Sequence, residues 1–169
     1  MAMMTYDVAE PALFRELLGH YPTGVCVVTS LSESGDPVGM TVGSFTSVSL
    51  DPPLIAFYPG RSSRSWPAIR SAMRFCINIL ADHQEDVCRS FAESGANKFA
   101  GVGWTSSSRG LPLLDGALAG INCTIDAIHP GGDHLIVVGK VDSFDLLDAG
   151  APLVFLKGTF GSFAPRAAA

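Results

Sequence analysis

Apolar and polar residues alternate along residues 39–53, GMTVGSFTSVSLDPP. Met40, Val42, Val48 and Leu50 occupy even positions, whereas the odd positions are mostly polar, with Phe45 as the exception. Because side chains of a strand point alternately to its two faces, this pattern predicts a strand with one face on the core, running into a hydroxyl-rich bend. Such a bend presents backbone N–H groups and short donors, which suit a flat heterocycle or a phosphate. The pattern alone favours the plainer interpretation, a half-buried strand with a serine-rich turn.

The rest of the chain predicts about seven strands and two or three short helices. The expected strands cover residues 24–30, 37–44, 54–58, 75–80, 118–128, 134–144 and 152–156. The expected helices are a segment capped by Asp7 that continues through Leu18, then residues 66–71 and 84–93. Residues 96–103 read as a loop, and residues 104–112 as irregular structure or a weak strand. Tight turns join many of the strands and regular β-α-β alternation is missing, so we expect a closed or split antiparallel barrel with peripheral helices.

Composition favours one domain that covers residues 1–169, with a core at about 14–163. Hydrophobic residues make up 47% of the chain and charged residues only 16%, so we expect a second copy of the chain to cover part of the apolar surface. The net charge of −5 argues against a nucleic acid partner. Six of the eleven basic residues nevertheless lie between Arg61 and Lys98, which fits a small anionic ligand.

The four cysteines form no C-x-x-C pair, and three lie in apolar surroundings, so we expect free buried thiols. The first residues, MAMMTYDVAEP, lack the basic and apolar regions of a signal peptide. No apolar run approaches the length of a membrane span. These features predict a soluble, cytoplasmic protein without a membrane partner.

The familiar catalytic motifs are missing from the sequence. There is no Walker A loop or G-x-S-x-G elbow, and Gly101-x-Gly103 lacks the third glycine of a dinucleotide fingerprint. The histidines lack metal-ligand spacing, so we expect no metal site. Three weaker candidates are the RSSR loop at 61–64, the Asn97-Lys98-Phe99 segment, and His134 after a Gly-Gly-Asp turn. Each has a plain alternative: a solvated basic loop, a surface lysine beside a packing phenylalanine, and a surface histidine at the start of a strand.

In their order and spacing, these blocks resemble the short-chain flavin reductases, which have a Greek-key FMN-binding split barrel. The resemblance runs from about Phe14 to Phe163 and includes YPTGVCVVTS, GMTVGSFTSVSLDPPLIAF, RSSRSWPAI, MRFCINIL, FAESGANKF, LPLLDGALAGINC and GGDHLIVVGKV. These proteins are the reductase components of two-component flavin-dependent monooxygenases. The resemblance implies a homodimer that uses NADH or NADPH to reduce FMN or FAD and supplies reduced flavin to a monooxygenase partner.

The resemblance also implies roles for individual residues. The isoalloxazine ring would be lined by β-strand residues, namely Thr41, Val42, Ser44, Ser47, Val48 and Ser49. The ribityl phosphate would meet Ser62, Ser63 and Arg64, with Lys98 and Phe99 closing the site. His134 would face the nicotinamide and either position it or tune the local charge. Gly43 departs from the family pattern, because many relatives carry Asn or Ser there.

Hydride transfer needs no strong acid or base, which agrees with the lack of an acid/base pair in the sequence. It needs the donor and acceptor carbons held roughly 3–3.5 Å apart. Two other interpretations stay open at this point. One is a split barrel that binds flavin or haem without NAD(P)H reductase activity, and the other is a flavoenzyme of the pyridoxamine-phosphate-oxidase type.

Overall fold

The computed structural model describes residues 10–95, 97–147 and 150–165, and the predicted cap at Asp7 lies outside them. Three helices occur in these ranges: α1 (Pro11–Leu18), α2 (Trp66–Ala72) and α3 (Glu85–Ala92). The strands there are β1 (Thr23–Gly24), β2 (Cys26–Leu31), β3 (Pro37–Val42), β4 (Thr46–Leu50), β5 (Pro53–Phe57), β6 (Arg74–Ile79), β7 (Trp104–Ser106), β8 (Pro112–Leu114), β9 (Ala119–Gly131), β10 (His134–Leu146), β11 (Leu153–Leu156) and β12 (Thr159–Ser162).

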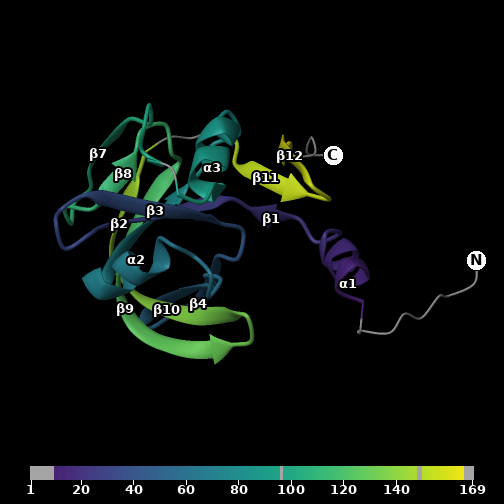
Figure 1. Ribbon diagram of the computed structural model, residues 1–169. Coiled ribbons are helices and arrows are strands. Elements are labelled where there is room, and N and C mark those ends of the chain that lie inside the picture. The colour runs from purple at the N-terminus through teal and green to yellow at the C-terminus, as the bar shows by residue number, and fades with distance from the viewer. Residues whose placement is uncertain (1–9, 96, 148–149, 166–169) are drawn as a thin grey trace, which may run out of the picture.

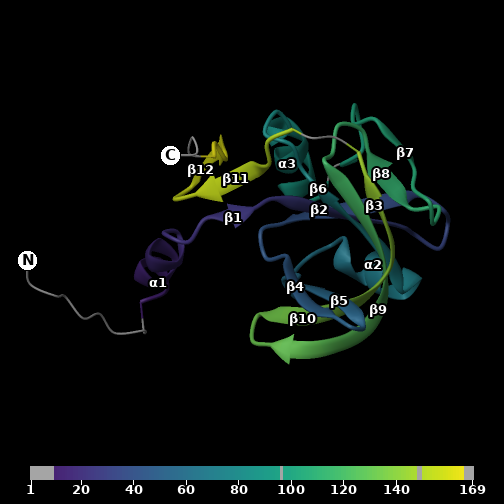
Figure 2. The same cartoon turned by 180° about the vertical axis from the view of Figure 1, so that it is seen from behind.

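Seven strands form the main sheet, in the order β3-β2-β6-β9-β10-β5-β4, and every neighbouring pair is antiparallel. The long strands β9 and β10 cross the molecule together, with register shifts next to Gly139 and between Val141 and Ser143. Such irregularities bend a strand pair, and Figures 1 and 2 show the curved β9–β10 ribbon. The prediction of a mainly β, antiparallel fold is therefore confirmed.

The main core fills the inside of this curved sheet. It joins Met40 of β3, Phe57 of β5, Phe75 of β6 and Val137 of β10, which come from opposite ends of the strand order. Helix α2 supplies the buried Trp66, whose ring centroid lies 6.0 Å from that of Phe57. Strands that are far apart in the order of the sheet, such as β3 and β5, share one core because the sheet curls. The predicted barrel requires a curled sheet of this kind.

The outer face of β2 is also covered. Val25 and Val27 pack with Leu80, with Phe91 of α3 and with Leu153 of β11 in a second buried cluster. Residues 25–30 are consequently buried without alternation, as expected for a strand covered on both faces. The position of α3 places Phe91 directly against Gly39 of β3, where an added β-carbon would lie 2.6 Å from the Phe91 Cε1 atom.

Two small sheets extend the molecule, in the orders β1-β11-β12 and β7-β8. Figure 1 shows β1, β11, β12 and α1 projecting to one side of the main sheet. The prediction of about seven strands was wrong, since the described residues form twelve. Strands β1, β8 and β12 were missed; they are two to four residues long, and each pairs within a small sheet that local sequence patterns do not reveal. Strand β4 was also missed, and β7 lies where the sequence allowed either irregular structure or a weak strand.

The stretch at 39–53 also differs from its prediction. Strand β3 ends at Val42, and the hydroxyl-rich residues that follow the turn belong mainly to a second strand, β4, which pairs with β5. The two strands are the opposite edges of the main sheet, although only residues 43–45 separate them in the chain. Among the described residues, no helix is long and apolar enough to span a membrane.

Candidate functional site

A cleft of about 730 Å³ lies where three segments meet. Its walls come from the end of β3 and the following turn (residues 40–44), from residues 58–60 after β5, and from the β9–β10 turn and the start of β10, with Thr23 at one side. Because β3 is an edge strand, its outward backbone N–H and C=O groups are not used by a neighbouring strand of the sheet. A cleft of this size, with apolar walls and backbone groups along one edge, suits a planar organic ligand.

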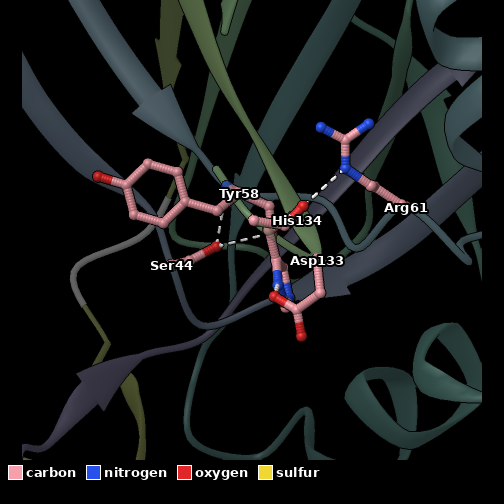
Figure 3. Close-up of polar contacts among 6 residues, drawn as sticks. Ser44, Tyr58, Arg61, Asp133 and His134 are labelled. Atoms are coloured by element: carbon pink, nitrogen blue, oxygen red, sulfur yellow. Dashed lines mark hydrogen bonds and ion pairs between the residues drawn. The ribbon is translucent and has the colours of Figure 1, made fainter. Parts of the chain in front are cut away.

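His134 stands at the mouth of this cleft, at the first residue of β10 (Figure 3). Its Nδ1 atom lies 2.7 Å from a carboxylate oxygen of Asp133, and the hydrogen bond lowers the pKa of Asp133. The other ring nitrogen faces Gly60, where an added β-carbon would lie 3.7 Å from Nε2 and 3.9 Å from the hydroxyl oxygen of Ser62. With Nδ1 engaged, Nε2 is the atom that the ring can present to a ligand.

The turn that carries His134 is bound to the loop that follows β5. Gly60 and His134 form an antiparallel β-bridge, and the amide of Leu135 donates to the carbonyl oxygen of Pro59 over 3.0 Å. Arg61 adds a side-chain bond, in which Nε donates to the carbonyl oxygen of Gly132 over 2.8 Å. The predicted basic loop and the predicted Gly-Asp-His turn therefore lie side by side.

A second, smaller pocket of about 240 Å³ contains two cations. It is lined by Arg64, Lys98 and Phe99, together with the first half of β3 and the start of α2. The Lys98 ammonium donates to the carbonyl oxygen of Phe91 over 2.9 Å, and partial burial lowers the pKa of Lys98. None of the described residues that line this pocket is a carboxylate, so its positive charge is available for an anion such as a phosphate.

Strand β3 is the wall that the two cavities share. Val38 and Gly39 line the cation pocket, and the following residues, Met40 to Gly43, line the cleft beside His134. At about 3.3 Å per residue, Val38 and Gly43 lie roughly 16 Å apart along the strand. The chain thus places a cationic end and a histidine end along one exposed sheet edge.

Three of the predicted flavin-binding hydroxyls already form hydrogen bonds within the protein. Thr41 Oγ1 donates to the carbonyl oxygen of Cys88 over 2.7 Å, which ties β3 to α3. Ser44 Oγ accepts from the Tyr58 amide over 3.0 Å and lies 3.4 Å from the carbonyl oxygen of the same residue (Figure 3). Ser63 Oγ accepts from the Trp66 amide over 3.3 Å at the start of α2. Thr41 and Ser44 line the cleft and Ser63 lies at the start of α2, and the contact of all three with a flavin stays a prediction.

Ser47, Val48 and Ser49 lie apart from both cavities. Ser47 and Ser49 line a mainly apolar groove of about 300 Å³ with Ile121, Phe144 and Leu146, and Val48 is 52% exposed. Within one chain the structure therefore does not bring the β4 serines next to His134, and their contact with a flavin stays a prediction. In the other direction, no sequence pattern assigned the cleft-lining residues Thr23, Tyr58, Gly60 and Gly131 to a site. The available hints were two turn signals, at Pro59-Gly60 and at the Gly-Gly-Asp turn before His134.

No group of three or more His, Cys, Asp or Glu side chains suitable for holding a metal occurs in the described residues. All four cysteines are buried and free, as predicted. Burial raises the pKa of Cys26 and of Cys76 to about 12, so these thiols are protonated and poor nucleophiles at neutral pH.

Comparison with known proteins points to one family. Residues 18–164 match the flavin reductase like domain. A flavin reductase from Pseudomonas putida is 46% identical over 96% of both chains. An FMN reductase (NADH) from Agrobacterium fabrum is 43% identical over 89% of this chain and 84% of that protein.

Solved structures agree with the sequence comparison. The NADH:FAD oxidoreductase of Streptomyces globisporus, in complex with NAD and FAD fragments, superposes with a TM-score of 0.91. It is 35% identical and covers 98% of this chain and all of that one. The antiparallel fold, the shared strand wall and these matches together show that the chain belongs to the family of proteins with a flavin reductase-like domain.

Proposed function

We propose that the protein is an NAD(P)H:flavin oxidoreductase that transfers hydride from NADH or NADPH to FMN or FAD. One observation carries the proposal: a single exposed strand edge, β3, borders an unpaired cationic pocket at one end and the His134 cleft at the other. The names of relatives support it, since they include an FMN reductase (NADH) and an NADH:FAD oxidoreductase. The whole flavin reductase domain, with its core at about 14–163, would act as one unit.

The residues present fit a flavin. Arg64 and Lys98 provide positive charge for a phosphate, with Phe99 beside them. The edge of β3, with Thr41 and Val42, offers backbone groups to a ring in the larger cleft. Ser62 and His134 both border Gly60, where an added β-carbon would lie 3.9 Å from the Ser62 hydroxyl oxygen and 3.7 Å from His134 Nε2.

When bound, the flavin supplies the redox chemistry, and the protein binds and orients the reactants. His134 would place the nicotinamide, with Asp133 holding the imidazole by its Nδ1 atom. Backbone N–H groups of the strand edge would stabilise negative charge that develops on the ring system. The apolar side chains in the cleft walls, such as Val42 and Leu135, would limit the access of water.

A monooxygenase partner follows from the relatives. One is the reductase subunit of a flavin-dependent monooxygenase from Rhodococcus jostii, 40% identical over 94% of this chain and 81% of that protein. We expect this protein likewise to supply reduced flavin to an oxygenase, by diffusion rather than in a stable complex, and to act in the cytoplasm.

A homodimer is supported by the exposed apolar side chains. Helix α1 has no buried residue, and its Leu17 is 67% exposed. On the β4–β10 side of the sheet, Leu50 is 90% and Leu146 is 82% exposed. Apolar area of this extent is typical of a surface that another chain covers. Ser47 and Ser49 lie in the same groove as Leu50 and Leu146, so in a dimer they would lie at or near the interface.

The decisive experiment follows the near-ultraviolet absorbance of the reduced nicotinamide with each of the four flavin and nicotinamide pairs. We expect oxidation that depends on both protein and flavin. Flavin binding without nicotinamide oxidation would instead identify a split barrel that only holds its cofactor. Oxidation of a phosphorylated amine, with no nicotinamide consumed, would identify a flavoenzyme of the pyridoxamine-phosphate-oxidase type.

A further inference from the structure

We propose that Arg61 is a positioning residue that holds the His134 turn against the flavin-phosphate loop and thereby couples flavin binding to hydride transfer. The inference rests on the proposed reductase function. It concerns the first residue of the predicted basic loop at 61–64, for which the family resemblance implied no role of its own.

Arg61 makes two hydrogen bonds to consecutive carbonyl groups of the β9–β10 turn. Its Nε atom donates to the Gly132 oxygen over 2.8 Å, and its backbone amide donates to the Asp133 oxygen over 2.9 Å. Figure 3 shows the Arg61 side chain beside the turn that carries Asp133 and His134. Both bonds hold the backbone immediately before His134.

The turn needs support from outside its own hairpin. Pairing of β10 with β5 begins only at Val137 and Phe57, so residues 134–136 have no partner strand on that side. The loop at 59–61 takes the place of that strand, through Arg61, through the bridge at Gly60 and through the bond from Leu135 to Pro59. Among the described residues, Arg61 is the side chain outside the hairpin that hydrogen-bonds to this turn.

The other side of the loop is anchored in the core. Three residues after Gly60, the hydroxyl oxygen of Ser63 accepts a hydrogen bond from the amide of Trp66, the first residue of α2, and Trp66 is 4% exposed. Arg64, which lines the cationic pocket, lies between Ser63 and the helix. Binding of a phosphate near Arg64 would therefore order the short loop at 59–64. Arg61 of the same loop is hydrogen-bonded to the turn that carries His134.

A competing role for Arg61 is simple charge, because its exposed guanidinium could bind a phosphate of the nicotinamide dinucleotide. The two roles are separable by chemistry. Lysine keeps the charge but has a methylene group where arginine has Nε, so Arg61→Lys removes the bond to Gly132 and retains the cation. Arg61→Met removes both. Arg70→Met, at an exposed arginine on α2, is the matched control for loss of a surface charge.

The test measures hydride transfer by anaerobic rapid mixing, and FMN affinity by fluorescence titration. We expect Arg61→Lys and Arg61→Met each to slow hydride transfer about 5- to 10-fold, the effect of losing one solvent-exposed hydrogen bond. In a His134→Ala background the same changes should cause no further loss, because Arg61 acts through His134. A normal rate for Arg61→Lys, or a loss that persists without His134, would assign Arg61 to charge or to general stability and overturn the proposal.

A readout in the flavin-free protein separates this inference from the reductase function. Amide hydrogen exchange at Leu135 reports the bond between the turn and Pro59. We expect exchange to be about 5- to 10-fold faster in Arg61→Lys and Arg61→Met than in wild type, and unchanged in Arg70→Met. Unchanged exchange in both Arg61 variants would overturn the positioning role even if the wild-type protein reduces flavin. Absence of flavin reduction in wild type, with faster exchange in the variants, would overturn the proposed function alone.

Discussion

Replacing Lys98 by methionine tests the cationic pocket directly. Methionine has nearly the same length as the lysine stem but no charge, so the change removes the ammonium group that lies 2.9 Å from the Phe91 carbonyl oxygen. If this group also meets a flavin phosphate, the affinity for FMN must fall. Riboflavin shares the ring system with FMN but has no phosphate, so its affinity should stay close to the wild-type value.

The magnitude follows from the partial burial of Lys98. A charge-assisted hydrogen bond contributes about 1.5–3 kcal/mol when it is well desolvated, and a partly exposed cation contributes less. We therefore expect a loss of about 1–2 kcal/mol, which is roughly a 5- to 30-fold rise in the Kd for FMN. The Phe91 carbonyl also loses its donor, so a small decrease in stability should accompany the change.

Flavin fluorescence titration of both ligands at several salt concentrations is the assay, with Lys140→Met as a control at an exposed lysine on β10. The ratio of the two Kd values cancels general effects on stability. Burial lowers the pKa of Lys98, so its charge disappears at a lower pH than that of an exposed lysine. FMN affinity of the wild type should fall as the pH rises through that lowered pKa, and this component should be missing in Lys98→Met. Equal weakening of FMN and riboflavin would refute the phosphate assignment.

Three further predictions concern the packing, the cleft and the thiols. Gly39→Ala should lower the free energy of unfolding by about 1–3 kcal/mol in chemical denaturation, because the new β-carbon would lie 2.6 Å from Cε1 of the buried Phe91. The control is Gly161→Ala, which should change stability little because no atom lies within 4 Å of the added β-carbon. His134→Ala should slow hydride transfer in anaerobic rapid mixing more than it weakens flavin binding, and an unchanged rate would remove His134 from the nicotinamide site. Burial raises the pKa of Cys26 to about 12, so the thiol keeps its proton in the folded state, whereas the unfolded thiol loses its proton above about pH 9. The free energy of unfolding should therefore fall as the pH rises from 9 towards 12. A Cys26→Ala variant should lose less stability over this range.

Local patterns were sufficient for the long elements of this chain. Runs of β-branched residues such as those in β2 and β6, and turn residues such as those at 130–133, carry their structural preferences in neighbouring positions. The ordered blocks from residue 14 to 163 also identified the family, and with it the type of reaction, without any coordinates. Arg64, Lys98 and Phe99 line one pocket, and their contact with a flavin stays a prediction.

The curling of the sheet decided what local patterns could not. It makes β3 and β4 opposite edges of one sheet, so the hydroxyl groups that seemed to form one continuous wall are divided between a cleft and a separate groove. It also brings residues 59–61 against residues 132–135, a contact between segments about 70 positions apart that includes the bond from Arg61 to Gly132. Periodicity reports which face of a strand is buried, whereas the partners of a strand edge depend on long-range pairing and on the closure of the sheet. The sequence by itself thus determined the family and most of the elements, and the tertiary structure decided which of the candidate residues can meet the same ligand.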